Sequence, residues 1–180
     1  MATQNYFRSI SILREAMLSD NKLRVIHYHK VWTSSFVWAD PVPEKLVEDV
    51  KRRVGKKFPE DFFVFLTLIS NGAILYRNAV DAMTGYKIFS IDEFLEKQAH
   101  WQESLKGLWL SNFIAIGEII SENRPLVMDL DSPTKDGQSC KLLEGNAYDP
   151  VSHWLKLSQS FHEWIDQLIT AQGAQYWLWR

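Results

Sequence analysis

Residues 43–73 read PEKLVEDVKRRVGKKFPEDFFVFLTLISNGA, and this stretch predicts two consecutive helices. The initial proline suits the first turn of a helix, where its missing N–H is not needed, and the apolar residues that follow recur on one face. Gly55 ends this helix. A second helix begins at Pro59, where Glu60 and Asp61 complement the positive end of the helix dipole. Apolar residues cover most of its circumference, so we expect it to be the most buried helix of the molecule.

Upstream of this stretch, the sequence predicts a helix followed by extended chain. Residues 5–18 place apolar side chains at helical spacing, with charged residues off that stripe. From 23 to 38 the content of β-branched and aromatic residues rises, which favours extended chain up to the turn at Asp40-Pro41. An amphipathic helix of this kind needs another element to cover its apolar face.

Downstream, short apolar segments separated by Gly, Asn, Asp or Pro predict strands. Ser90 and Glu93 have capping-box spacing, which predicts a helix between two of these segments. Ser160 and Glu163 repeat that spacing at the start of a closing helix. The Asp-Gly pair at 136–137 lies between two strand segments and predicts a hairpin turn. The expected strands cover residues 73–76, 86–89, 113–116, 125–130 and 138–143.

The order of these elements predicts an α+β fold. The order along the chain is a helix, extended chain, two helices, strands with one inserted helix, and a closing helix. Alternating strand and helix units are therefore missing. We therefore expect one domain with a mainly antiparallel sheet backed by helices. No internal repeat, low-complexity stretch or linker divides the 180 residues, a length that is usual for a single domain.

The composition is that of a globular protein without strong attraction to nucleic acid or lipid. Apolar residues make up 46% and charged residues 23% of the chain, and the net charge of −2 gives no strong overall field. Cys140 is the only cysteine, which excludes an intramolecular disulfide and favours a reducing compartment. No segment has the character of a signal peptide or a membrane span, so we expect a cytoplasmic protein.

The sequence pattern of 43–73 resembles the signature of the SUKH superfamily: a helix, a glycine, an apolar residue followed by proline, an acidic pair, an aromatic-rich helix and an Asn-Gly exit. Further pieces follow in the family's order, and Trp32 or Trp38 is similar to the tryptophan often found upstream. Ala73 departs from the family, in which a second glycine is common. The resemblance spans roughly 32–169 and includes YKIFSIDEFLE, FIAIGEI, PLVMDLD and SFHEWIDQLI.

This resemblance implies an α+β SUKH fold, a role in binding other proteins and no catalytic residues. Residues 1–31 are then an N-terminal helix and strand extension, 32–173 the SUKH-like domain and 174–180 an aromatic tail packed on the domain. Bacterial members are similar to immunity proteins that neutralise toxins, often nucleases. The alternative is a regulatory or scaffold module that binds an endogenous protein, as fungal relatives that regulate cell-wall synthesis suggest.

Three groups of residues are candidates for a metal or catalytic site, and none of them has a complete set of partners in the sequence. His27 and His29 could face the same way on a strand and hold a metal, or be an ordinary solvated pair. Asp129 and Asp131 could share a divalent cation or end a strand at a turn. Cys140 has no histidine partner visible in the sequence and is expected to be an inert core residue. We therefore predict no catalytic residue, no cofactor and no metal site.

Charged residues gather in two regions of opposite sign. A basic cluster at 51–57 ends a predicted helix, where a solvated face is favoured over nucleic-acid binding. Residues 117–150 carry seven acidic and three basic residues, which suits contact with the basic cleft of a nuclease. The alternative is ordinary solubility of a sheet edge. The predicted partner-binding residues are Glu118, Glu122, Asp131, Asp136 and Glu144.

The expected partner is a protein, most naturally a toxin, without direct contact to nucleic acid or membrane. The chain itself is expected to be a monomer or a weak homodimer. The aromatic tail at 174–180 either docks back onto the domain or anchors an association.

Overall fold

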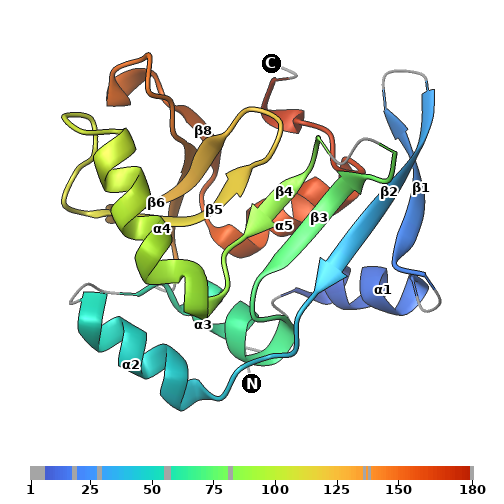
Figure 1. The fold of residues 1–180 in the computed structure, drawn as a ribbon, viewed down its shortest axis with the longest axis horizontal. Helices are drawn as coiled ribbons and strands as arrows, with labels where there is room; N and C mark the ends of the chain where they lie inside the picture. Colours follow the sequence, from blue (N-terminus) through green and yellow to red (C-terminus); the bar gives the residue numbers. More distant parts are fainter. Residues whose placement is uncertain are drawn as a thin grey trace.

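Eight strands form one antiparallel sheet in the computed structural model, which describes residues 7–17, 20–27, 30–54, 58–80, 83–135, 137 and 139–178. Each strand pairs with its neighbour in the sequence, so the order across the sheet is the order along the chain (Figure 1). The strands are β1 (Lys22–His27), β2 (Lys30–Trp38), β3 (Ala73–Asn78), β4 (Tyr86–Ile88), β5 (Phe113–Ile119), β6 (Arg124–Pro133), β7 (Cys140–Glu144) and β8 (Leu155–Ser158).

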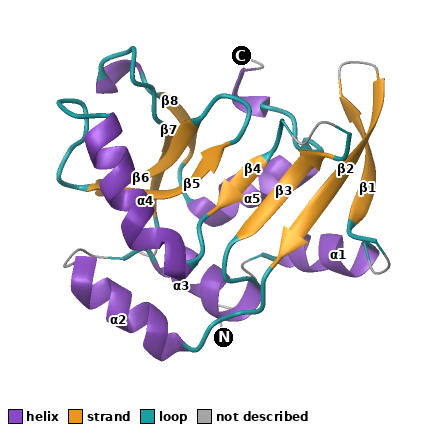
Figure 2. Ribbon diagram, viewed as in Figure 1, coloured by secondary structure: helices purple, strands orange, loops and turns teal. Residues whose placement is uncertain are grey.

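Helices cover this sheet, as Figure 2 shows in purple against the orange strands. The predicted α+β fold with a mainly antiparallel sheet backed by helices is therefore confirmed. The helices are α1 (Arg8–Ala16), α2 (Glu44–Val54), α3 (Glu60–Val64), which continues as the π-helix η2 (Phe65–Ile69), α4 (Ile91–Ser104) and α5 (Phe161–Thr170), with short 3-10 helices η3 (Val151–His153) and η4 (Tyr176–Leu178). None of the helices in the described part of the chain has the length and apolarity needed to cross a membrane.

Two hydrophobic cores lie on opposite faces of the sheet. In β5 and β6, Ile114 and Met128 belong to the larger core, which also contains Trp164 of α5. Phe113 and Val127, their neighbours in the sequence, belong to a smaller core. Successive side chains of a strand point to opposite faces, so this part of the sheet is covered on both sides. The smaller core is completed by Phe89, Trp101, Leu105, Ala115, Leu143 and Trp154.

The acidic pair of the 43–73 stretch has a role that the sequence does not reveal. Asp61 is fully buried, and its Oδ2 accepts hydrogen bonds from the Ser139 hydroxyl (2.5 Å) and from the backbone N–H of His162 (3.1 Å). Its Oδ1 accepts from the backbone N–H of Phe62 (2.9 Å). The expectation that Asp61 serves the dipole of its own helix is therefore incomplete, because the side chain also binds the first turn of α5 and the residue before β7.

The Ser-Asn-Gly sequence after η2 connects this helix to the end of β2 and to the start of α4. The hydroxyl of Ser70 accepts from the backbone N–H of Ala39 just after β2 (3.0 Å). The side-chain oxygen of Asn71 accepts from the backbone N–H of Ile91 in the first turn of α4 (2.8 Å). Gly72 has φ +84°, and a Cβ there would lie 2.8 Å from the backbone nitrogen of Ser90, so glycine is required at this close approach. Short polar side chains thus join β2, η2 and α4.

The two helix starts predicted from capping-box spacing are confirmed, whereas the strand count is not. Ser90 and Glu93 form a complete capping box at the start of α4, and the Ser160 side chain accepts from the backbone N–H of Glu163 in α5. The extended region at 23–38 is two strands, and β8 was not expected because LKLS has little apolar content. Leu68 is 60% exposed although it was expected in the core. The change to π-helical geometry over η2 alters the side that each residue faces.

Candidate functional site

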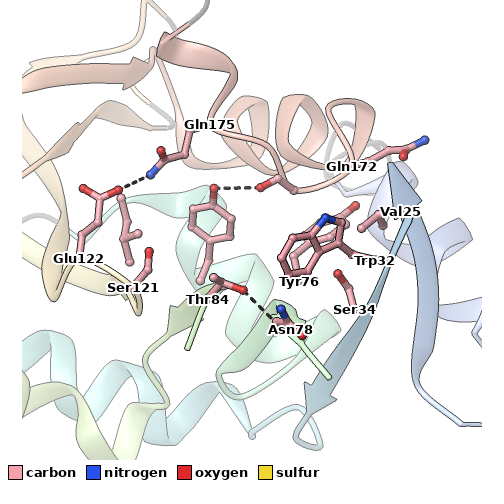
Figure 3. Close-up of a pocket in the computed structure, with 14 residues that line it drawn as sticks. Val25, Trp32, Ser34, Tyr76, Asn78, Thr84, Ser121, Glu122, Gln172 and Gln175 are labelled. Carbon is pink, nitrogen blue, oxygen red and sulfur yellow. Dashed lines mark hydrogen bonds between the residues drawn. The ribbon is translucent and has the colours of Figure 1, made fainter. Parts of the chain in front are cut away.

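A crevice of about 340 Å³ lies between the β1–β2 hairpin, strands β3 and β4, the β5–β6 turn and the segment that follows α5. This volume is within the range of ligand-binding pockets. Figure 3 shows Glu122 and Gln175 at one end of the crevice and Trp32 and Val25 at the other. The crevice is lined by Val25, Trp32, Ser34, Tyr76, Asn78, Thr84, Gly85, Tyr86, Ile119, Ser121, Glu122, Gln172, Gly173 and Gln175.

Unusual backbone conformations gather around this crevice. Tyr76 (φ 53°) and Gln172 (φ 54°) occupy the left-handed region, although neither is a glycine. Gly85 (φ 114°) and Gly173 (φ 83°) lie there as well. A Cβ on Gly173 would approach the Tyr76 ring to 2.4 Å. Glycine adopts this region without strain, and Gln172 and Gly173 follow the end of α5. In Tyr76, inside a strand, the conformation costs free energy and is of a kind often found at binding sites.

Aromatic rings and a C-terminal segment shape the walls. Tyr86 donates a hydrogen bond from its hydroxyl to the carbonyl oxygen of Gly173 (3.0 Å). Tyr76 donates more weakly to the carbonyl oxygen of Ile169 at the end of α5 (3.4 Å). Burial raises the pKa of both tyrosines well above the usual range, so both remain protonated donors at neutral pH. Trp32 of β2 is 38% exposed and presents a ring to solvent at the crevice.

Three charged side chains form what we call the acidic wall: Glu122, Arg124 and Glu144. A single guanidinium nitrogen, Nη1 of Arg124, lies 2.9 Å from Oε2 of Glu122 and also binds the carboxylate of Glu144. Glu144 is only 2% exposed. Burial raises the pKa of Glu144 above its ordinary value, and the hydrogen bond from Arg124 offsets part of this effect. Two carboxylates therefore share one cation at this end of the crevice.

The acidic wall also accepts hydrogen bonds from the segment that follows α5. The amide nitrogen of Gln175 donates to Oε1 of Glu122 (2.6 Å), a bond that Figure 3 marks with a dashed line. The indole N–H of Trp177 donates to Oε2 of Glu144 (3.1 Å), and the Trp177 side chain is buried. The segment that closes one side of the crevice is thus attached to both carboxylates.

Exposed apolar side chains lie on the β3–β4 connection, next to the crevice. Val80 is 92% exposed on the β3–β4 connection, and Met83 beyond it is also exposed. A hydrogen bond from the backbone N–H of Ala79 to the carbonyl oxygen of Thr33 (2.9 Å) fixes this connection beside β2. We call Val80 and Met83 the apolar rim, because they lie on the connection between Asn78 and Thr84, which line the crevice, and exposed apolar side chains of this kind are typical of protein contacts. Ile26 and Val31 are also largely exposed, but the alternation of side chains along a strand places them on the face of the β1–β2 hairpin opposite to Val25 and Trp32, which line the crevice.

The acidic residues predicted from the sequence do not form one surface. Glu122 and Glu144 meet at the acidic wall, where Glu144 is buried. Glu118 lies 3.7 Å from the ammonium group of Lys97 in α4. Asp131 is exposed near the opposite end of β6 from the β5–β6 turn. Asp136 lies outside the described residues.

The other candidate groups have structural explanations where they are described. Asp129 accepts hydrogen bonds from the side chains of Asn112 (2.5 Å) and Ser132 (2.7 Å) and from the backbone N–H of Asp131 (3.2 Å), so it ends a strand at a turn. Cys140 is buried in the larger core. Within the described ranges, no three His, Cys, Asp or Glu residues come together to hold a metal ion. The side chains of the predicted histidine pair at 27 and 29 lie outside the described part.

Two residues of the basic cluster, Lys51 and Arg52, pair with carboxylates of their own helix. Lys51 lies 2.9 Å from the carboxylate of Glu48, and its ammonium group sits 4.0 Å from the centre of the Phe63 ring. Arg52 pairs with Asp49 one turn earlier. Positions 55–57 lie outside the described residues. These contacts agree with the solvated helix face favoured by the sequence.

Sequence reasoning missed the crevice itself. Its walls come from residues near 32, 76, 86, 122 and 173, which only the tertiary fold brings together. The one local signal was the Gln172-Gly173 pair, which the sequence shows as a helix end. The left-handed conformation of Tyr76 has no counterpart in the residue type, since tyrosine disfavours it.

Comparisons with known proteins agree with this architecture. Residues 41–167 match the model of the SMI1 / KNR4 family (SUKH-1). The uncharacterized protein YnaB of Bacillus subtilis (strain 168) is 22% identical over 144 residues, which are 80% of this chain and 88% of YnaB. The uncharacterized protein YobM of the same organism is 28% identical over 127 residues, which are 68% of this chain and 62% of YobM.

Proposed function

The chain belongs to the SMI1 / KNR4 family (SUKH-1), and from this premise we propose that it is a non-enzymatic binding protein that neutralises a toxin by covering a functional surface of it. The observation that carries the proposal is the combination of the crevice with the apolar rim. A concave site with exposed apolar side chains beside it suits a protruding element of another protein. The resemblance of bacterial relatives to immunity proteins supports the choice of a toxin as the partner.

Charge supports a basic partner, and a nuclease is one such class. Glu122 is the predicted contact residue that lies at the crevice, and we propose that it faces the partner directly. Glu144 acts through Arg124, because its carboxylate is buried. Glu118 and Asp131 lie elsewhere on the molecule and contribute to the approach of a basic partner through their long-range field.

The test begins with the polypeptide encoded next to the gene of this protein. Co-expression should restore growth of cells that produce this polypeptide, and the purified pair should form a complex measurable by calorimetry. A toxic neighbour that this chain neither binds nor neutralises would contradict the proposal. A neighbour without toxicity, together with capture of a defined endogenous protein through the same crevice, would favour the regulatory or scaffold alternative.

The binding face is tested with a matched pair of variants. Val80→Gln combined with Met83→Gln removes apolar contact at the rim without adding charge, and we expect affinity to fall about tenfold or more, as for the loss of one to two buried side chains. Leu68→Gln is the control, because Leu68 is comparably exposed on η2. Equal effects of the two changes would show that the apolar rim is not the contact surface.

A further inference from the structure

We propose that the crevice is a receptor for a cationic side chain, a guanidinium or an ammonium group, presented by the partner protein. The inference deepens the proposed function, since it names the chemistry of the partner residue that enters the site. It rests on the proposed function only for the source of that side chain, and binding of the cation itself can be measured without any partner.

The lining of the crevice is selective by charge. Among the described residues that line it, none is Lys, Arg or His, and Glu122 is the one that carries a formal charge. A phosphate or carboxylate ligand would be repelled by Glu122, and the nearby Arg124 is already shared by Glu122 and Glu144. A cationic group is attracted, because opposite charges within a partly enclosed site interact more strongly than in open water.

The acidic wall has a deficit of positive charge. Arg124 is shared by Glu122 and Glu144, so the three side chains carry a net negative charge when both carboxylates are ionised. This negative charge faces the crevice, since Glu122 is one of the residues that line it. A ligand cation would supply the second positive charge that the two carboxylates lack.

Aromatic rings offer the other half of a cation site. Trp32, Tyr76 and Tyr86 all line the crevice, and the faces of such rings attract ammonium and guanidinium groups. Tyr76 and Tyr86 are buried and their hydroxyls are directed to backbone carbonyl oxygens, so the ring that is open to a ligand is that of Trp32, at the end of the crevice opposite to Glu122.

Acceptors for a guanidinium are present beside the carboxylate. A guanidinium carries five N–H donors and needs several oxygen atoms around it. Figure 3 shows Ser121 and Gln175 next to Glu122, which places a hydroxyl and a side-chain amide oxygen near the carboxylate. The volume of about 340 Å³ exceeds what one planar guanidinium and its methylene stem occupy, so the crevice can admit the side chain together with part of its backbone.

The test uses N-acetyl-arginine methylamide as the probe and the citrulline derivative as its neutral isostere. Each is titrated into the full chain at millimolar concentration while the indole N–H signal of Trp32, assigned by its loss in Trp32→Phe, is followed by NMR. We expect the arginine derivative to shift this signal and to bind at least tenfold more tightly than the citrulline derivative. Equal binding of the two compounds, or a shift only with N-acetyl-aspartate methylamide, would overturn the proposal.

Variants decide whether the acidic wall is responsible. Glu122→Gln should weaken binding of the arginine derivative at least fivefold. The control is Glu103→Gln, which should leave binding unchanged, because Glu103 of α4 is exposed and pairs with Lys106. Ser121→Trp fills the crevice and should abolish the shift, so retained binding in this variant would place the site elsewhere. If the chain neutralises a toxin but its crevice does not bind the arginine derivative, this inference is wrong and the proposed function still holds.

Discussion

Replacing Asp61 with asparagine removes the charge that joins α3 to β7 and α5, and we expect a large loss of stability. The Asp61 carboxylate is fully buried and accepts hydrogen bonds from Ser139, His162 and Phe62. Asparagine keeps one acceptor oxygen and turns the other atom into a donor. At least one buried N–H or O–H then faces another donor, whichever way the amide is oriented.

The expected magnitude follows from these contacts. A hydrogen bond to a charged group contributes about 1.5–3 kcal/mol, and removing one partner of a buried charged network costs about 3–5 kcal/mol. We therefore expect Asp61→Asn to lower the free energy of unfolding by about 3–5 kcal/mol, a large share of the roughly 5–15 kcal/mol typical of a domain.

The assay is equilibrium unfolding in urea, followed by far-UV circular dichroism and tryptophan fluorescence. Glu60→Gln is the matched control, because it removes a charge from the preceding residue, which is only partly buried. This control should stay within about 0.5 kcal/mol of the unmodified chain. A loss of less than about 1 kcal/mol in Asp61→Asn would refute the reasoning that this carboxylate fixes the fold.

Three further predictions concern the same elements and the crevice. The hydrogen bond with Asp61 raises the pKa of His162. The contribution of this histidine to stability is therefore fully present below the unfolded-state pKa of about 6.5 and is lost as pH rises through the folded-state pKa. Urea titrations at several pH values should show this decline in the unmodified chain and not in His162→Gln. Gly173→Ala should destabilise the folded chain by about 1–3 kcal/mol because of the close approach to Tyr76. The loss should exceed that of the control Gly107→Ala, where φ is similar but no atom lies within 4 Å of the added Cβ. Equal shifts in melting temperature would show that the contact with Tyr76 is unimportant. Deleting residues 174–180 should lower the melting temperature of a monomer markedly, since Trp177 is buried against Glu144; intact stability with lost association would instead make the tail an interface.

The fold class could be predicted because its signals are local. Helix starts depend on residues three positions apart, as Ser90 and Glu93 demonstrate with a complete capping box. The break between α2 and α3 follows from a glycine and a proline in the sequence. Strand β8 could not be predicted, because its two leucines alternate with polar residues over only four positions. Its place in the sheet is set by pairing with β7.

The candidate site was less predictable because its parts are distant in the sequence. A local excess of acidic residues gave no information about which ones meet, and the fold places Glu118 beside Lys97 and buries Glu144 beside Arg124. The crevice also depends on a tyrosine in a left-handed conformation, which tertiary contacts impose. Residue type and spacing could not indicate either feature.

The central claim is that the crevice and its apolar rim are the surface that recognises a protein partner. Hydrogen–deuterium exchange of the chain, alone and in complex with the partner protein identified by co-expression, measures this surface directly. We expect slowed exchange in the complex over residues 31–34, 76–80, 83–86 and 119–122, with little change in α2. Protection confined to α2 and α3, with unchanged exchange around the crevice, would contradict the claim.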